Sequence, residues 1–389
     1  LEIGGRDYRL QRSQKFFQTN TGDEIRADGD EVIEIFDQQN GETVSDAGKN
    51  NKTKQNWINT KIIPPKISQF FFFDGEDIKK YTDKPEEEIK EAIVQILGIK
   101  ALTNAMTDVR DVEKLKEALR NYRVAVVMHF AALISVADSV SNPIAYYEAN
   151  VEGTLSLLSA MVDVGVEVMV FSSTAAVYGK PDYSPMCEDH PTRPLNAYGE
   201  SKLAIERAFP HYERAYGLKI SKLRYFNASG ADSKGRLGEV HDPETHLIPR
   251  AFNAVLGGAP LEIFGEEYST PDGTCLRDFV HVTDLADAHV RVLRHLQDGG
   301  ESGVYNVGTG SAYSVREVIQ MVERVTGQRV PTISSPRRIG DPSSLLAASD
   351  RIQNELGWMP IHSDLQEIVE SAWRWHQTGW HGSATGDTG

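Results

Sequence analysis

The sequence contains little cysteine, no long apolar run and no excess of basic residues. Cys187 and Cys275 are its only cysteines and form neither a metal-ligand nor a disulfide pattern, so we expect a reducing, cytoplasmic setting. No apolar run approaches the roughly 20 residues of a membrane-spanning helix, so we expect no membrane partner. The net charge of −15 argues against nucleic-acid binding, and we expect none for residues 106–389.

The chain also lacks a glycine-rich nucleotide-binding loop. Neither G-x-G-x-x-G nor G-x-x-G-x-x-G follows a first predicted strand. The nearest strings are residues 307–313, which follow a late strand, and residues 381–389, which we expect to form a disordered tail. Such a loop binds a pyrophosphate through its N–H groups and a helix N-terminus, so its absence removes the usual anchor of a dinucleotide.

Lysine and arginine divide the chain into two parts. Residues 1–100 contain 11 Lys and 4 Arg, whereas residues 101–389 contain 7 Lys and 19 Arg. Folding does not require this switch, because both side chains are adequate solvated surface cations, although they differ at bidentate sites. We therefore expect two segments of different origin, 1–105 and 106–380, and a chimaeric or fragmentary reading frame that starts at Leu1.

The first segment, residues 1–105, predicts an α+β unit unrelated to the rest of the chain. Residues 29–42 alternate apolar and polar positions and end in Asn-Gly, a hairpin signal, and residues 84–99 have the spacing of a helix. The string FFFFDGEDI (70–78) before that helix resembles the N-terminal lobe of the SMC-like ATPases of DNA sulfur-modification systems, over residues 15–105. The G-x-x-x-x-G-K-[ST] loop of such ATPases is absent, so we expect no ATPase activity.

From about residue 107 onward, predicted strands and helices alternate. Apolar strand patterns occupy residues 124–133, 167–179 and 219–227, with helical patterns over 150–165 and 195–208. This alternation predicts an α/β fold with a Rossmann-like, doubly wound parallel sheet that is truncated at its N-terminal side. We expect a smaller C-terminal substrate domain to follow the sheet.

Tyr198 and Lys202 have a Y-x-x-x-K spacing within the last of these helices. Positions i and i+4 share a helix face, so the lysine ammonium would lie near the phenol and favour its anion. Such a phenolate suits an enzyme that takes a proton from an alcohol while a nicotinamide takes the hydride. With 14 Tyr and 18 Lys in the chain, about 0.6 such pairs arise by chance, so the spacing alone leaves an ordinary solvated helix face as the alternative.

Ten sequence blocks in order over residues 107–380 resemble the UDP-glucose 4-epimerases, a family of extended short-chain dehydrogenases/reductases. They include FSSTAAVYG (171–179), NAYGESKLAIE (196–206), HLIPRAF (246–252) and PRRIGDP (336–342). The resemblance implies a cytoplasmic isomerase that interconverts UDP-galactose and UDP-glucose through a 4-keto intermediate with a retained NAD. It implies a UDP-hexose as the substrate and a possible homodimer. Because the cofactor loop is missing, we expect the printed chain itself to be inactive.

The resemblance also implies roles for individual residues, and no metal site. Tyr198 would take the 4-hydroxyl proton, Lys202 would stabilise the phenolate, and Thr174 would pass the proton or orient the sugar oxygen. Arg277 and Arg338 would bind the diphosphate. The cofactor-binding residues that it implies are Asp108, Val109, Phe130, Ala131, Ala132, Asn150, Ser172, Tyr198, Lys202 and Phe226. The substrate-binding residues are Asn227, His246, Leu247, Phe264, Arg277, Arg338 and Asp341.

Other interpretations stay open on the sequence. A different sugar-nucleotide short-chain enzyme is one, although 4,6-dehydratases carry an Asp-Glu pair where this chain has Ala175 and Ala176, which favours epimerisation. A non-catalytic chimaeric fragment is another. For single residues, Thr174 could merely cap a nearby N–H, and Arg277 and Arg338 could form surface ion pairs.

Overall fold

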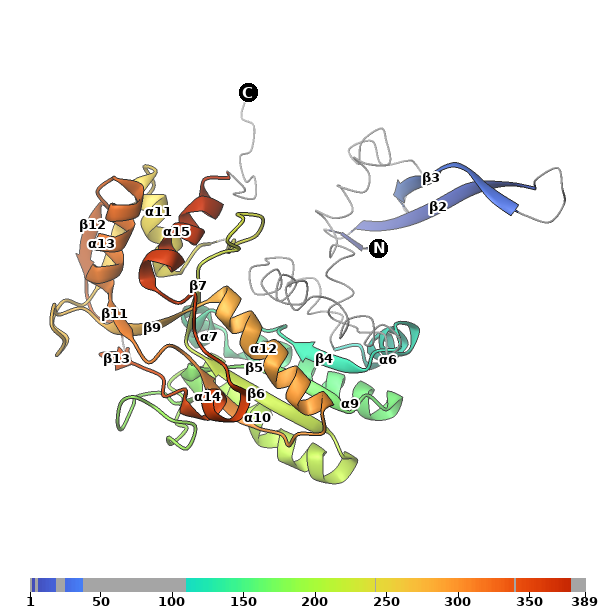
Figure 1. Cartoon of the computed structure of the whole chain (residues 1–389), viewed down its shortest axis with the longest axis horizontal. Helices are drawn as coiled ribbons and strands as arrows, with labels where there is room; N and C mark the ends of the chain where they lie inside the picture. The colour runs from blue at the N-terminus through green and yellow to red at the C-terminus, as the bar shows by residue number, and fades with distance from the viewer. Residues whose placement is uncertain are drawn as a thin grey trace. The chain divides into compact units, whose positions relative to one another are not determined.

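The computed structural model describes residues 2–3, 6–18, 25–37, 110–241, 243–338 and 341–378 (Figure 1). The chain divides into two compact units, Leu1–Gln69 and Phe70–Gly389. The predictions for Asp108 and Val109, for the helix over residues 84–99 and for the tail over residues 381–389 lie outside the described residues.

The described part of the first unit is a three-stranded antiparallel sheet in the order β1-β2-β3. Strands β2 and β3 pair from Tyr8 opposite Asp37 to Gln18 opposite Ile25. The strand expected within residues 29–42 is present, but its described partner precedes it in the chain instead of following the Asn-Gly turn. The three strands are β1 (Glu2–Ile3), β2 (Arg6–Gln18) and β3 (Ile25–Asp37).

The second unit contains a parallel sheet in the order β10-β6-β5-β4, which confirms the predicted α/β class with a parallel sheet. Its strands are almost entirely buried, which explains the continuous apolar runs that predicted them. Among the strands that the structure describes, β4 pairs with β5 alone. The four strands are β4 (Val126–His129), β5 (Val168–Thr174), β6 (Lys219–Tyr225) and β10 (Val304–Val307).

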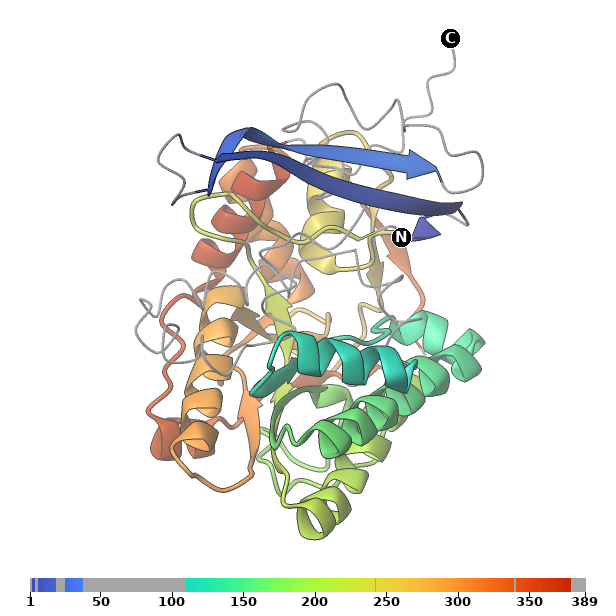
Figure 2. The same ribbon diagram turned by 90° about the vertical axis from the view of Figure 1, so that its right-hand side faces the viewer.

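Helices cover both faces of this sheet. Helices α6 (Val112–Asn121), α9 (Gly153–Val164) and α10 (Ala197–Tyr216) lie on one face, and α12 (Val282–Gln297) lies on the other (Figures 1 and 2). No helix in the described ranges is long and apolar enough to cross a bilayer. The core between the first three helices and the sheet includes Leu115, Leu119, Leu157, Leu158, Met161, Met169, Phe171, Ile205 and Phe209.

A second core lies where helices α11, α13 and α15 pack around short strands, and it brings the C-terminal part of the chain together (Figure 1). Strand β9 pairs with β7, β11 and β13, and β8 pairs with β12.

The remaining elements complete the second unit. The helices are α11 (Leu247–Val255), α13 (Val315–Thr326), α14 (Asp350–Leu356) and α15 (Leu365–His376). The strands are β7 (Asn227–Ser229), β8 (Leu261–Phe264), β9 (Leu276–His281), β11 (Ala312–Ser314), β12 (Thr332–Ser335) and β13 (Ser344–Leu345). Short helical segments are α7 (Val136–Ser141), α8 (Pro143–Tyr146), η2 (Tyr147–Glu152) and η3 (Ala175–Val177).

A buried ion pair fixes α10 against the sheet. The Arg224 guanidinium on β6 donates from Nε to both carboxylate oxygens of Glu206 on α10, at 3.1 and 3.2 Å. The Ser173 hydroxyl on β5 donates to the same carboxylate at 2.5 Å, and Arg224 also donates to the Tyr178 hydroxyl at 3.1 Å. Removing one partner of such a pair typically costs about 3–5 kcal/mol, so this network holds α10 and its catalytic candidates in a fixed position.

Candidate functional site

A cavity of about 410 Å³ opens at the carboxyl ends of β5 and β6 and is lined on its other sides by α11, β8 and β9. Parallel sheets bind ligands at this edge. The cavity gathers residues that are up to 242 positions apart in the chain, from Ile134 to His376. Ten residues predicted from the sequence line it: Thr174, Tyr198, Phe226, Asn227, His246, Leu247, Phe264, Arg277, Arg338 and Asp341.

Tyr198 lies in the cavity because α10 begins close to the end of β5. The Asn196 side chain caps the helix by accepting from the Gly199 N–H at 2.9 Å. A Cβ atom at Gly199 would lie 2.6 Å from the Ala176 carbonyl oxygen, so only glycine allows this close approach. The Tyr198 and Thr174 side chains hydrogen-bond each other. Thr174 also accepts from the Ala176 N–H at 3.1 Å, so it is a local cap as well as a cavity residue.

The environment of Tyr198 keeps its phenol protonated. Burial is the main cause that raises the pKa of Tyr198, and the neighbouring Tyr225 adds to it, while the hydrogen bond with Thr174 opposes it. The residue keeps some solvent exposure, but its hydroxyl lies in surroundings that exclude water strongly. Tyr198 therefore needs a nearby positive charge before it can accept a proton.

The Lys202 ammonium does not supply that charge in this structure. Its Nζ donates to the Ser172 carbonyl oxygen at 2.9 Å and lies 4.8 Å from the centre of the Phe171 ring. Burial lowers the pKa of Lys202 to about 7, although the Glu206 carboxylate opposes the shift. Tyr198 and Lys202 share a helix face as predicted, but the lysine side chain points to β5. With this pKa, Lys202 can gain or lose a proton near neutral pH.

We expect Lys202→Met to raise the free energy of unfolding by about 1–4 kcal/mol at pH 6, because methionine fills the space without burying a charge. The folded pKa of about 7 lies below the ordinary 10.5. The cost of burying the charge is therefore full below pH 7 and falls as the pH rises toward 10.5. Urea unfolding at pH 6 and pH 9.5 should show a smaller gain at the higher pH, with the exposed Lys180→Met as control. An equal gain at both pH values would contradict this interpretation.

Besides Lys202, five of the predicted cofactor residues that the structure describes do not line the cavity. Phe130, Ala131 and Ala132 follow β4 and are buried, and the Phe130 ring lies 4.8 Å from that of His289. The Asn150 side chain bonds both the N–H and the carbonyl of Leu133, at 2.8 and 3.1 Å, and reaches Ser201 on α10 at 3.0 Å. Asn150 thus fixes the segment after β4 against the helix that carries Tyr198. The fifth, Ser172, is buried on β5 with its hydroxyl 3.4 Å from His289 Nε2.

The two predicted diphosphate ligands are held by other protein groups. Arg277 on β9 forms an ion pair with Asp341, and both side chains are largely buried in the cavity wall. The Arg338 guanidinium stacks on the Phe264 ring at 3.9 Å. These contacts hold both guanidinium groups in the cavity wall, from where they could turn to bind an anion. The neighbouring Arg337 stacks outside the cavity on Tyr268 at 3.7 Å.

Sequence reasoning missed several cavity residues. Tyr225 directly precedes the predicted Phe226 in the sequence, but only the structure shows that it lines the cavity and lies near Tyr198. Glu239 and His241 lie in the loop before α11 and form a cluster with Glu244 and His246. Their spacing, E-x-H-x-x-E-x-H, was visible in the sequence, but only the structure shows that the four side chains meet.

The described residues fit one end of a dinucleotide better than the other. Lys202, Ser172 and the small residues after β4 place a lysine ammonium, a hydroxyl and two alanines at the carboxyl edge of the sheet, which suits a ribose and a flat ring. The printed sequence holds no glycine-rich loop for the pyrophosphate. The residues that the structure describes therefore account best for binding of the sugar and for transfer of the proton.

Comparison with known proteins gives a consistent result. The sequence profile of the NAD dependent epimerase/dehydratase family matches residues 78–308. A UDP-glucose 4-epimerase from Halalkalibacterium halodurans is 48% identical over 279 residues, which cover 72% of this chain and 84% of that protein. The profile begins earlier than the blocks quoted above, which start at residue 107. The ATPase-lobe resemblance over residues 15–105 stays a prediction.

Two solved structures are similar to this chain in fold and in sequence. UDP-glucose 4-epimerase from Brucella ovis in complex with NAD is similar with a TM-score of 0.67 and 45% identity, over 69% of this chain and 83% of that one. The enzyme from Bifidobacterium longum in complex with NAD⁺ and UDP has a TM-score of 0.66 and 37% identity, over 71% and 83% of the two chains.

Proposed function

Because this chain belongs to the NAD dependent epimerase/dehydratase family, we propose that residues 106–380 form the substrate and proton-transfer part of a UDP-glucose 4-epimerase. The reaction interconverts UDP-galactose and UDP-glucose. The observation that carries the proposal is that one cavity is lined by Tyr198 and Thr174 and also by Arg277 and Arg338. This combination provides a proton acceptor and two anion-binding groups for one ligand.

Tyr198 is the group that takes the proton of the sugar 4-hydroxyl. Its pKa must fall first, and Lys202, one helical turn along α10, lowers it if its ammonium leaves the Ser172 carbonyl and turns toward the phenol. The Thr174 hydroxyl, already hydrogen-bonded to Tyr198, then orients the sugar oxygen. NAD, which the family uses, supplies the hydride acceptor when it is bound.

Arg277 and Arg338 are the groups that hold the UDP diphosphate. An arginine fork binds phosphate oxygens in pairs, and the substrate would compete with Asp341 for Arg277. Phe264 then becomes available to stack on the uracil once Arg338 turns to the phosphate. Asn227, exposed at the start of β7, and the His246–Leu247 backbone complete the sugar side.

We expect Arg338→Ala to weaken UDP binding about 10–100-fold, because it removes a charged hydrogen-bond donor from the diphosphate. Calorimetric titration of the printed chain with UDP measures this effect. Arg337→Ala is the matched control, since its guanidinium stacks on Tyr268 outside the cavity and its loss should leave UDP affinity within about twofold. Equal effects of the two variants would remove Arg338 from the substrate site.

Dehydration is the competing reaction within the family. It requires an additional acid and base near the sugar, and the positions after Thr174 hold Ala175 and Ala176 instead. Product analysis with UDP-glucose would detect a 4-keto-6-deoxy sugar if the chain were a dehydratase.

The fold proposal is a doubly wound sheet that lacks its first strands. In the usual order of such sheets, the first strand pairs with the strand that β4 represents, and β4 is the last strand in the described order. The C-terminal part with α11, α13 and α15 would then be the substrate domain. A homodimer and a cytoplasmic location stay predictions.

A further inference from the structure

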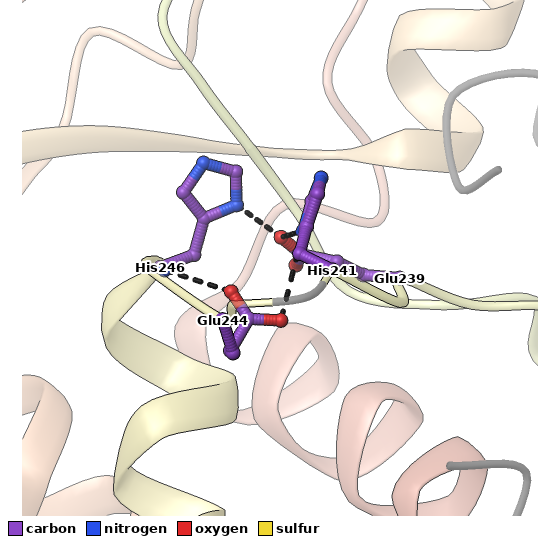
Figure 3. Close-up of side chains that lie close together, drawn as sticks. All are labelled: Glu239, His241, Glu244 and His246. Carbon is purple, nitrogen blue, oxygen red and sulfur yellow. Dashed lines mark hydrogen bonds and ion pairs between the residues drawn. The ribbon is translucent and has the colours of Figure 1, made fainter. Parts of the chain in front are cut away.

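Four side chains before and at the start of α11 point toward one another (Figure 3). Glu239, His241, Glu244 and His246 each place one nitrogen or oxygen atom within 4.8 Å of the others. His241 Nδ1 lies 2.9 Å from one Glu239 oxygen and 3.6 Å from a Glu244 oxygen. His246 Nδ1 contacts the same oxygen of Glu239. The part of the chain that the structure describes holds no second group of this kind.

We propose that this cluster binds a divalent transition-metal ion, with zinc as the expected occupant. The family resemblance implied no metal site, so the inference comes from the structure. Zinc binds imidazole nitrogen and carboxylate oxygen at about 2.0–2.2 Å in tetrahedral sites. In an ideal tetrahedral site with these bond lengths, the ligand atoms lie about 3.3–3.6 Å from one another. The four atoms of the cluster already lie within 4.8 Å of one another, so small side-chain rotations would bring them to that spacing.

The donor set suits a divalent cation in both type and charge. Two neutral imidazoles and two carboxylates would balance the charge of Zn²⁺, and mixed nitrogen and oxygen ligands favour late first-row metals over Mg²⁺ or Ca²⁺. His241 Nδ1 is buried and aligned with neither carboxylate for a hydrogen bond.

The ligands are also close together in sequence. All four lie within residues 239–246, so a metal ion would close only a short loop at small entropic cost. Three of them, Glu239, His241 and His246, line the cavity, and His246 is the residue before α11. A bound ion would therefore fix the N-terminus of α11 and one wall of the cavity.

The test measures metal binding and needs neither substrate nor activity. The printed chain, freed of metal by chelator dialysis, is titrated with zinc chloride against a chromophoric chelator. We expect one tight zinc ion per chain. Replacement of one ligand, in His241→Gln or Glu244→Gln, should weaken zinc binding by about 100-fold or more, at least as much as loss of a group that only orients a ligand.

His362→Gln is the matched control, because His362 forms a simple pair with Glu367 at 2.7 Å outside the cluster. It should bind zinc as the parent chain does. Circular dichroism checks that each variant is folded, and cobalt substitution gives a second readout, since tetrahedral Co²⁺ has intense visible bands that the parent should show. A parent chain without tight zinc, or zinc affinity unchanged in both ligand variants, would overturn the proposal. Because UDP binding is measured separately, failure here leaves the proposed function standing.

Discussion

Tyr198→Phe is expected to reduce epimerase turnover by about 10²–10⁴-fold. The variant is made in a restored chain, in which a glycine-rich first βα unit replaces residues 1–105. Phenylalanine keeps the ring against Thr174 and Tyr225 but removes the oxygen that takes the proton. UDP-sugar binding should stay nearly intact, because the diphosphate ligands are on β9 and in the segment before β13. Coupled assay of UDP-galactose conversion and calorimetry with UDP measure the two quantities.

Tyr212→Phe is the matched control for that variant. Tyr212 lies on the same helix and packs on the core beneath the sheet, outside the cavity. Its turnover should match that of the parent. Normal turnover by Tyr198→Phe would show that another group takes the proton and that the catalytic assignment is wrong.

The chain as printed is expected to contain no stoichiometric NAD and to show no measurable epimerisation. Epimerisation needs the cofactor to stay bound through both hydride steps, and most of its anchoring at the pyrophosphate comes from loop N–H groups and a helix dipole. The printed residues contain no such loop. Lys202 and the segment after β4 would hold only one end of the dinucleotide, and a displacement of about 1 Å can cost about 10²-fold in rate.

Enzymatic assay of the dinucleotide released on denaturation measures this prediction, beside a UDP-galactose turnover assay on the same sample. The UDP-glucose 4-epimerase from Brucella ovis, whose structure was solved in complex with NAD, is the positive control. About one NAD per chain together with steady conversion would contradict it, and would mean that residues 1–105 rebuild a phosphate site of a kind the sequence does not reveal.

Local pattern was enough to predict three of the four strands of the sheet and two of the helices that cover it. The apolar run over residues 124–133 became β4, and the string over 195–208 became the start of α10 with Tyr198 in place. Gly199 and Asn196 fix that start through contacts within a few residues. Features that depend on one helix turn or one strand can therefore be predicted from sequence.

Contacts across the fold could not be predicted in the same way. Lys202 shares a helix face with Tyr198, but the Ser172 carbonyl on β5 captures its ammonium. The Arg277–Asp341 pair and the Arg338–Phe264 stack join segments that are 64 and 74 residues apart. Each of these partners is decided by packing between elements, which no spacing rule encodes. The family resemblance gave the residues but not these resting positions.

The turnover of UDP-galactose by the restored chain tests most directly whether residues 106–380 carry the substrate and the proton-transfer groups of an epimerase. With a glycine-rich first βα unit before residue 106, the chain should bind about one NAD, convert UDP-galactose to UDP-glucose, and lose that conversion with Tyr198→Phe, while the printed chain shows none. A restored chain that is folded, holds one NAD and binds UDP, yet converts no UDP-galactose, would contradict the assignment of residues 106–380 as the substrate and proton-transfer part of an epimerase.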